Sequence, residues 1–144
     1  GIPSFSPEHF RYVNNADPMK SKQLFKGLDQ LMDEGVAQLF TLDMNGRKII
    51  GTVGALQYEV IQYRLEHEYG AKCSYENINV HKACWVQAED PKNDEFKEFK
   101  RVKQRYLAKD KQGQLVFLAD SAFTIQMTQS KYPTVKLHFT SEYE

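Results

Sequence analysis

The sequence is poor in cysteine, and it carries no net charge. Cys73 and Cys84 are too few and unsuitably spaced for a zinc site. We expect two reduced thiols on neighbouring strands, with a disulfide as the alternative. Basic and acidic residues are equal in number, 19 each, which argues against avid nucleic-acid binding by the whole surface but leaves room for a local basic patch. No apolar run reaches the roughly 18 residues of a membrane span, so we expect no membrane partner.

Motifs that bind nucleotides or carry out catalysis are also missing. The sequence has no GxxxxGK[ST] phosphate loop and no GxGxxG fingerprint. Gly51 and Gly54 bracket a short run between an expected strand and an expected helix, which we interpret as a tight turn, with a phosphate site as the alternative. The histidines form no HxxxH or HExxH pattern, and no nucleophile, base or metal-ligand set is visible. We therefore expect no catalytic residue and no metal site in this chain.

Hydrophobic periodicity predicts two α+β lobes packed as one unit, a first lobe of residues 1–78 and a second of residues 79–144. In the first, Asp17 suits a helix N-cap, Gly35 a C-cap, and Asn45-Gly46 a type I′ hairpin turn with positive φ at both residues. The expected order is strand 8–14, helix 18–34, strand 37–43, strand 47–53, helix 55–69 and strand 71–78. This βαββαβ order is ferredoxin-like, with two helices on one face of a four-stranded antiparallel sheet.

Two finer features of the first lobe follow from its helices. Gly27 marks close packing, because a glycine inside a helix costs about 1 kcal/mol relative to alanine. In the second helix we expect an apolar stripe of Leu56, Val60, Tyr63 and Leu65, with Ile61 at its edge.

The second lobe is expected to be smaller, and we see no internal sequence repeat. Trp85 is interpreted as a core or inter-lobe anchor. The charged outer face of the expected third helix is interpreted as solvated, with a basic contact surface as the alternative. The predicted elements are strand 81–89, helix 91–109 and strands 115–119, 122–128 and 135–140.

The first helix has its charges in an unusual order. Lys20, Lys22 and Lys26 lie near its start, whereas Asp33 and Glu34 lie at its end. A helix dipole favours acids at the start and bases at the end, so this order is unfavourable by a few tenths of a kcal/mol per charge. It does, however, concentrate positive charge where helix N–H groups point outward, which suits phosphate. The alternative is an ordinary solvated face.

Several long ordered runs of the sequence form one pattern: Ile2-Pro3, residues 5–8 and 17–28, Leu31, Glu34-Gly35, residues 38–40 and 51–60, Arg64-Leu65, Asn79-Val80, Trp85-Val86, residues 95–97 and Tyr132-Pro133. These runs resemble the bacterial class II release factors, a family of translational GTPases that includes peptide chain release factor three. The first lobe is more distantly similar to the third domain of elongation factor G.

The resemblance implies a C-terminal ribosome-binding and coupling region, preceded in the family by a GTP-binding domain and a β-barrel domain. The resemblance also implies that the protein acts in protein biosynthesis in the cytoplasm. The parent GTPase would promote dissociation of the class I release factor after termination. The implied partners are the ribosome (small subunit and rRNA), the protein's own missing domains and, indirectly, the class I factor. GTP and Mg²⁺ would bind the missing domain, and this chain would hold no cofactor. The residues expected to contact the ribosome or the GTP-binding domain are Lys20, Lys22, Gln23, Lys26, Gly54 and Gln57.

Two other classes of protein remain open at this point. One is a free-standing ferredoxin-like domain that senses a small ligand near the turn at residues 51–55. The other is a small independent enzyme with a site between the lobes. The start Gly1-Ile2-Pro3 does not resemble a natural N-terminus, so we expect that the chain is cut from a longer protein.

Overall fold

One eight-stranded antiparallel sheet runs through the chain, in a computed structural model that describes residues 5–143. The strand order is β4-β1-β3-β2-β6-β7-β5-β8, and the helices α1 to α4 accompany it. The predicted α+β class is therefore confirmed. Gly1 to Pro3, from which we inferred a longer parent, and Glu144 lie outside the described residues.

The first lobe has the predicted βαββαβ order. Its strands are arranged β4-β1-β3-β2, every pairing is antiparallel, and α1 contacts α2 on one face. The expected first helix begins as a 3-10 turn, which Asp17 caps by accepting a hydrogen bond from the Met19 N–H at 3.0 Å. The elements are β1 (His9–Asn15), η1 (Pro18–Lys20), α1 (Ser21–Asp33), β2 (Gln38–Leu42), β3 (Lys48–Thr52), α2 (Leu56–Tyr69) and β4 (Cys73–Asn77).

The hairpin between β2 and β3 does not have the predicted turn. Gly46 has φ of 72°, but Asn45 does not have positive φ, so a type I′ turn is excluded. The Leu42 N–H donates to the Arg47 carbonyl at 2.9 Å, and the Gly46 N–H donates back to the Leu42 carbonyl at 2.9 Å. The loop therefore spans residues 43–46, and only its last residue needs the left-handed conformation that glycine adopts easily.

The second lobe repeats the topology of the first. Its strand order, β8-β5-β7-β6, corresponds position by position to β4-β1-β3-β2. The lobe is thus a second βαββαβ unit, although we saw no repeat in the sequence. Its elements are β5 (Lys82–Ala88), α3 (Asp94–Val102), η2 (Gln104–Tyr106), β6 (Leu107–Lys109), β7 (Leu115–Ala119), α4 (Ala122–Lys131) and β8 (Val135–His138).

Two predictions for the second lobe were wrong, and together they hid this repeat. The third helix ends at Val102 instead of residue 109, and the chain continues through η2 into β6. The segment predicted as strand 122–128 is helical, because Ser121 caps it by accepting the Thr124 N–H at 3.0 Å. Phe123, Ile125 and Met127 alternate along the sequence as apolar residues do in a strand, but only Ile125 of these three is buried.

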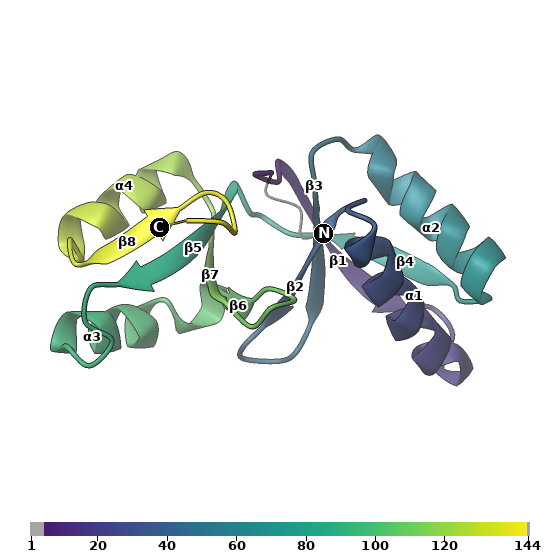
Figure 1. Cartoon of the computed structure of the whole chain (residues 1–144), viewed down its shortest axis with the longest axis horizontal. Helices are drawn as coiled ribbons and strands as arrows, with labels where there is room; N and C mark the ends of the chain where they lie inside the picture. The colour runs from purple at the N-terminus through teal and green to yellow at the C-terminus, as the bar shows by residue number, and fades with distance from the viewer. Residues whose placement is uncertain (1–4, 144) are drawn as a thin grey trace.

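The sheet is folded so that the uncovered faces of the two lobes pack together, while the helix pairs lie at opposite ends of the molecule (Figure 1). β2 and β6 join the lobes through the pairs Thr41–Lys109 and Leu42–Ala108. In a flat sheet β2 and β5 would be about 14 Å apart, three strand spacings. The ring centroids of Phe40 and Trp85 are nevertheless only 5.8 Å apart. Trp85 is thus the predicted inter-lobe anchor.

Three apolar clusters form the core. One lies under α1 and α2, one lies under α3 and α4, and the third lies between the lobes around Trp85. Cys73 and Cys84 are free and buried, in the first and second clusters. They are not on neighbouring strands as predicted, because β4 is an edge strand of the first lobe and β5 belongs to the second.

Candidate functional site

The expected basic contact residues lie on the outer face of α1 and of the turn before it. Lys20, Lys22, Gln23 and Lys26 are all exposed. The opposite face of α1 is buried against the sheet and α2 through Leu24, Gly27, Leu28, Leu31 and Met32. No side chain caps the N-terminus of α1, and its first turn holds no acid. Asp17, which caps the preceding η1, is thus the acid at this end, and the first turn of α1 itself adds lysines without a capping side chain or an acid.

The acids at the other end of α1 are paired with cations from distant parts of the chain. Lys111, in the turn between β6 and β7, places its Nζ 2.5 Å from Asp33 Oδ1 and 2.8 Å from the Asp29 carbonyl oxygen. Arg64 of α2 binds Glu34. Within residues 5–143, no ion pair or hydrogen bond involves the side chains of Lys20, Lys22 or Lys26. The acids at the C-terminal end of α1 are thus neutralised by ion pairs, whereas the lysines near its start have no such partners among residues 5–143.

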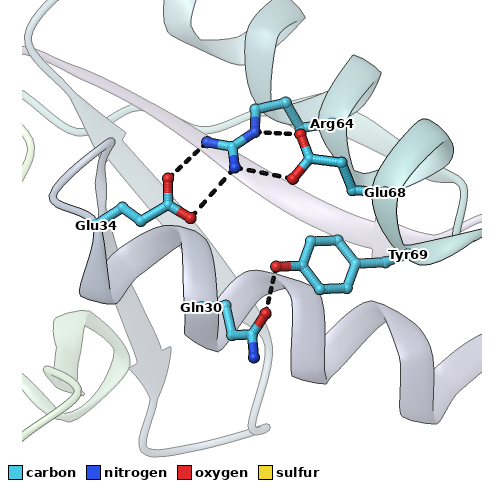
Figure 2. Close-up of polar contacts among 5 residues, drawn as sticks. All are labelled: Gln30, Glu34, Arg64, Glu68 and Tyr69. Atoms are coloured by element: carbon cyan, nitrogen blue, oxygen red, sulfur yellow. Dashed lines mark hydrogen bonds and ion pairs between the residues drawn. The ribbon is translucent and has the colours of Figure 1, made fainter.

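Arg64 holds the two helices of the first lobe together (Figure 2). Its Nη1 donates to Glu34 Oε1 at 2.8 Å, and its Nε donates to Glu68 Oε2 at 2.6 Å. Hydrogen bonds to Glu68 and then Glu34 raise the pKa of Arg64 above its usual range, and Arg64 lowers the pKa of Glu68. This bidentate geometry on each carboxylate fixes the relative position of the helices more firmly than a single contact.

This network predicts a pH dependence of stability. The pKa of Glu68 is lower in the folded chain than its usual value of 4.5. The stabilisation it gives is therefore present above that usual value and is lost as the pH falls through the lower, folded-state pKa. We expect Glu68→Gln to be slightly less stable than wild type at neutral pH, with the difference vanishing in acid. Urea unfolding at several pH values measures this. Glu59→Gln, at an exposed position of the same helix without an ion pair within residues 5–143, is the control, and an equal pH dependence in both variants would contradict the assignment.

The two helices run antiparallel, which separates the expected contact residues into two groups. Tyr69 donates to Gln30, while Arg64, earlier in α2, contacts Glu34, later in α1 (Figure 2). The start of α1 therefore lies beside the end of α2. Gly54 and Gln57, at the start of α2, lie at the opposite end of the helix layer from the lysines. The structure thus brings together Lys20, Lys22, Gln23 and Lys26 in η1 and the first half of α1, which we call the basic end of α1. Gly54 and Gln57 lie apart from them, at the start of α2.

Gly54 and Gln57 lie next to each other at the turn into α2. The Thr52 hydroxyl donates to the Gly54 carbonyl at 2.8 Å, and a Cβ added to Gly54 would lie 2.9 Å from Gln57 Oε1. Gly51 lies within β3 and is buried, and an added Cβ would meet Pro7 Cβ at 2.9 Å, so close packing accounts for a glycine there. Only residues 53–55 connect β3 to α2, in agreement with the interpretation of this segment as a tight turn.

Three members of the apolar stripe predicted in α2 lie exposed beside this turn. The buried residues of α2 are Tyr58, Ile61 and Leu65. Of the predicted stripe, Leu65 is buried, whereas Leu56 and Tyr63 are 68% and 64% exposed and Val60 is also exposed. α2 has two apolar faces, so periodicity alone could not tell which one is buried. Tyr58 is buried because its hydroxyl reaches backbone carbonyls, 2.7 Å from that of Ile50 and 2.9 Å from that of His9. We call Leu56, Val60 and Tyr63 the α2 outer stripe.

The described part of the chain lacks two other features, a metal-binding cluster and a membrane-spanning helix. Residues 5–143 contain no cluster of three or more His, Cys, Asp or Glu side chains that could hold a metal ion. None of the helices in this range is long and apolar enough to cross a membrane.

A protein-family model matches most of the chain. The family model is described as class II release factor RF3, C-terminal domain, and it matches residues 1–129. This range includes the whole first lobe, the α2 outer stripe, the basic end of α1 and most of the second lobe. It confirms the resemblance found in the sequence and associates the chain with translation termination. The chain belongs to the family of the class II release factor RF3 C-terminal domain.

Proposed function

We propose that this chain is the ribosome-binding and coupling region of a GTP-dependent release factor that promotes dissociation of class I release factors after termination. In this proposal the chain is non-catalytic and acts in the cytoplasm. GTP and Mg²⁺ bind a separate GTP-binding domain of the parent protein. The family match supports the release-factor role, and the charge distribution on α1 supports the mode of ribosome contact.

The observation that carries the ribosome contact is the unpaired basic end of α1. Lysines without carboxylate partners are free to neutralise phosphates, whereas Asp33 and Glu34 at the other end are already bound to Lys111 and Arg64. The chain has no net charge, so a contact with RNA must be local. We assign Lys20, Lys22 and Lys26, with Gln23 between them, to the small-subunit rRNA.

The α2 outer stripe supports a second contact, of a different chemistry. Leu56, Val60 and Tyr63 offer apolar surface and no positive charge, which suits protein and not a phosphate backbone. Gly54 and Gln57 border the stripe at the start of α2. We assign this end of the lobe to packing on the GTP-binding and β-barrel domains, so that the rigid α1–α2 layer links the nucleotide-dependent domains to the ribosome.

Ribosome binding across a salt series tests this proposal. The parent protein, held with a non-hydrolysable GTP analogue, is sedimented with ribosomes at increasing KCl concentration. Each neutralised phosphate contributes roughly 0.7–0.9 to the slope of log affinity against log salt. We expect the three lysines to contribute about 2 to 3 to that slope. Binding that is insensitive to salt, or the absence of any upstream GTP-binding domain in the gene, would contradict the proposal.

A further inference from the structure

The helix pair of the second lobe is open where that of the first lobe is closed. In the first lobe Gly27 approaches Leu65 and Tyr69 closely, and Arg64 bridges α2 to Glu34 at the end of α1. Within residues 5–143 no hydrogen bond or ion pair joins α3 to α4. A groove of about 120 Å³ lies there instead, lined by Val102, Lys103, Met127, Thr128, Lys131 and Tyr132. We call it the α3–α4 groove.

The groove combines exposed apolar side chains with unpaired positive charge. Val102 and Met127 are both exposed, and Phe123, one turn before Met127 on α4, is exposed as well. Lys103 and Lys131 form no ion pair within residues 5–143. Their ammonium groups lie over aromatic rings, 5.6 Å from the Phe117 centroid and 5.5 Å from the Tyr132 centroid. These contacts keep both cations at the groove.

A buried hydroxyl without a partner adds a third feature. Tyr132 is 1% exposed, and its hydroxyl has no hydrogen-bond partner among residues 5–143. A buried polar group without a hydrogen bond is costly and uncommon in folded proteins. Tyr132, which lines the groove, therefore carries a buried hydroxyl that residues 5–143 leave unsatisfied, and the two unpaired lysines lie beside it.

We propose that the α3–α4 groove binds an acidic amphipathic helix of a protein partner. Such a helix would place apolar side chains on Val102 and Met127, in the manner of helix-in-groove recognition. Its carboxylates would pair with Lys103 and Lys131. Methionine suits this role because its flexible thioether adapts to different apolar shapes. Apolar Val102 and Met127 between the lysines favour a protein partner over RNA, whose backbone offers only phosphates to such a surface.

The site is tested with a labelled helical peptide carrying leucines at positions i and i+4 and flanking glutamates. Its control replaces the glutamates with lysines. Fluorescence anisotropy with the full chain measures affinity, and the methyl resonance of Met127 reports the place of binding. We expect the acidic peptide to bind at least tenfold more tightly than the basic one and to shift the methyl resonance of Met127. Equal affinity, or an unshifted Met127, overturns the proposal.

Charge reversal makes the test specific to the groove. The double variant Lys103→Glu, Lys131→Glu should lower the affinity for the acidic peptide at least tenfold and raise the affinity for the basic peptide. The double variant Lys92→Glu, Lys97→Glu makes the same change in net charge outside the groove. It should leave the affinity for each peptide within about twofold of the wild-type value. Circular dichroism checks that each variant is folded, and Met127→Gln gives a second variant that should weaken binding without a charge change. A single-stranded oligoribonucleotide, or a second copy of the chain, that shifts Met127 in place of the peptide overturns the proposal in favour of that partner.

Discussion

Trp85→Ala is expected to lower the free energy of unfolding by about 3–5 kcal/mol, the usual range for removing a large buried aromatic side chain. Trp85 is fully buried between the lobes, and its indole N–H donates to Asp110 Oδ2 at 3.0 Å. Truncation would leave a cavity against Phe40 and remove this hydrogen bond. Because the cavity would lie in the cluster shared by both lobes, the loss should affect the whole molecule and not the second lobe alone.

Urea unfolding followed by far-ultraviolet circular dichroism measures this effect, since Trp85 is the single tryptophan and fluorescence would be lost with it. Tyr106→Ala is the control, because Tyr106 is 46% exposed. Its expected cost is below about 1 kcal/mol. A cost for Trp85→Ala similar to that of the control would show that the inter-lobe cluster contributes little.

Gly27→Val is expected to destabilise the chain by about 1–3 kcal/mol through overpacking. A Cβ at position 27 would lie 2.7 Å from Leu65 Cδ2 and 2.9 Å from the Tyr69 ring, so α1 and α2 would have to separate. In an exposed helix the same change would gain a few tenths of a kcal/mol, because valine has a higher helix propensity than glycine.

The sign of the effect therefore distinguishes close packing from helix propensity. Thermal and urea unfolding of Gly27→Val are compared with those of Lys97→Val, at an exposed position of α3 where only propensity changes. If close packing decides the effect, Gly27→Val loses much of its free energy of unfolding and Lys97→Val loses little. An unchanged or raised stability of Gly27→Val would mean that the helices can move apart at no cost.

The first lobe could be predicted from sequence because its signals are local. Asp17 and Gly35 mark the ends of the first helix, and the apolar residues of α1 recur with one clear period. The second lobe could not be predicted to the same extent. The polar sequence after Val102 hides the short strand β6, and alternation at Phe123, Ile125 and Met127 imitates a strand. The topological repeat requires β6 to be a strand and α4 to be a helix, so the order of elements predicted from the sequence does not show it.

The candidate site depended on contacts that sequence cannot supply. Lys111 is 78 residues from Asp33, and Arg64 is 30 residues from Glu34. Nothing local shows that these acids are paired while Lys20, Lys22 and Lys26 are not. The apolar residues of the α2 outer stripe were found as a pattern, but the pattern alone did not show that they are exposed, because Tyr58 and Ile61 pack on the sheet instead. The groove between α3 and α4 left no sequence signal.

The most direct test of the account is ribosome affinity after removal of the basic end of α1. Lys20→Ala, Lys22→Ala and Lys26→Ala are combined in the parent protein, and Lys97→Ala, Lys100→Ala and Arg101→Ala form a control with the same change in charge. We expect the first variant to stay folded, to bind ribosomes more weakly at low salt, and to lose about 2 to 3 from the slope of log affinity against log salt. The control should keep the wild-type affinity and slope. Equal affinity and equal slope in the first variant and wild type would contradict a ribosome contact at the start of α1.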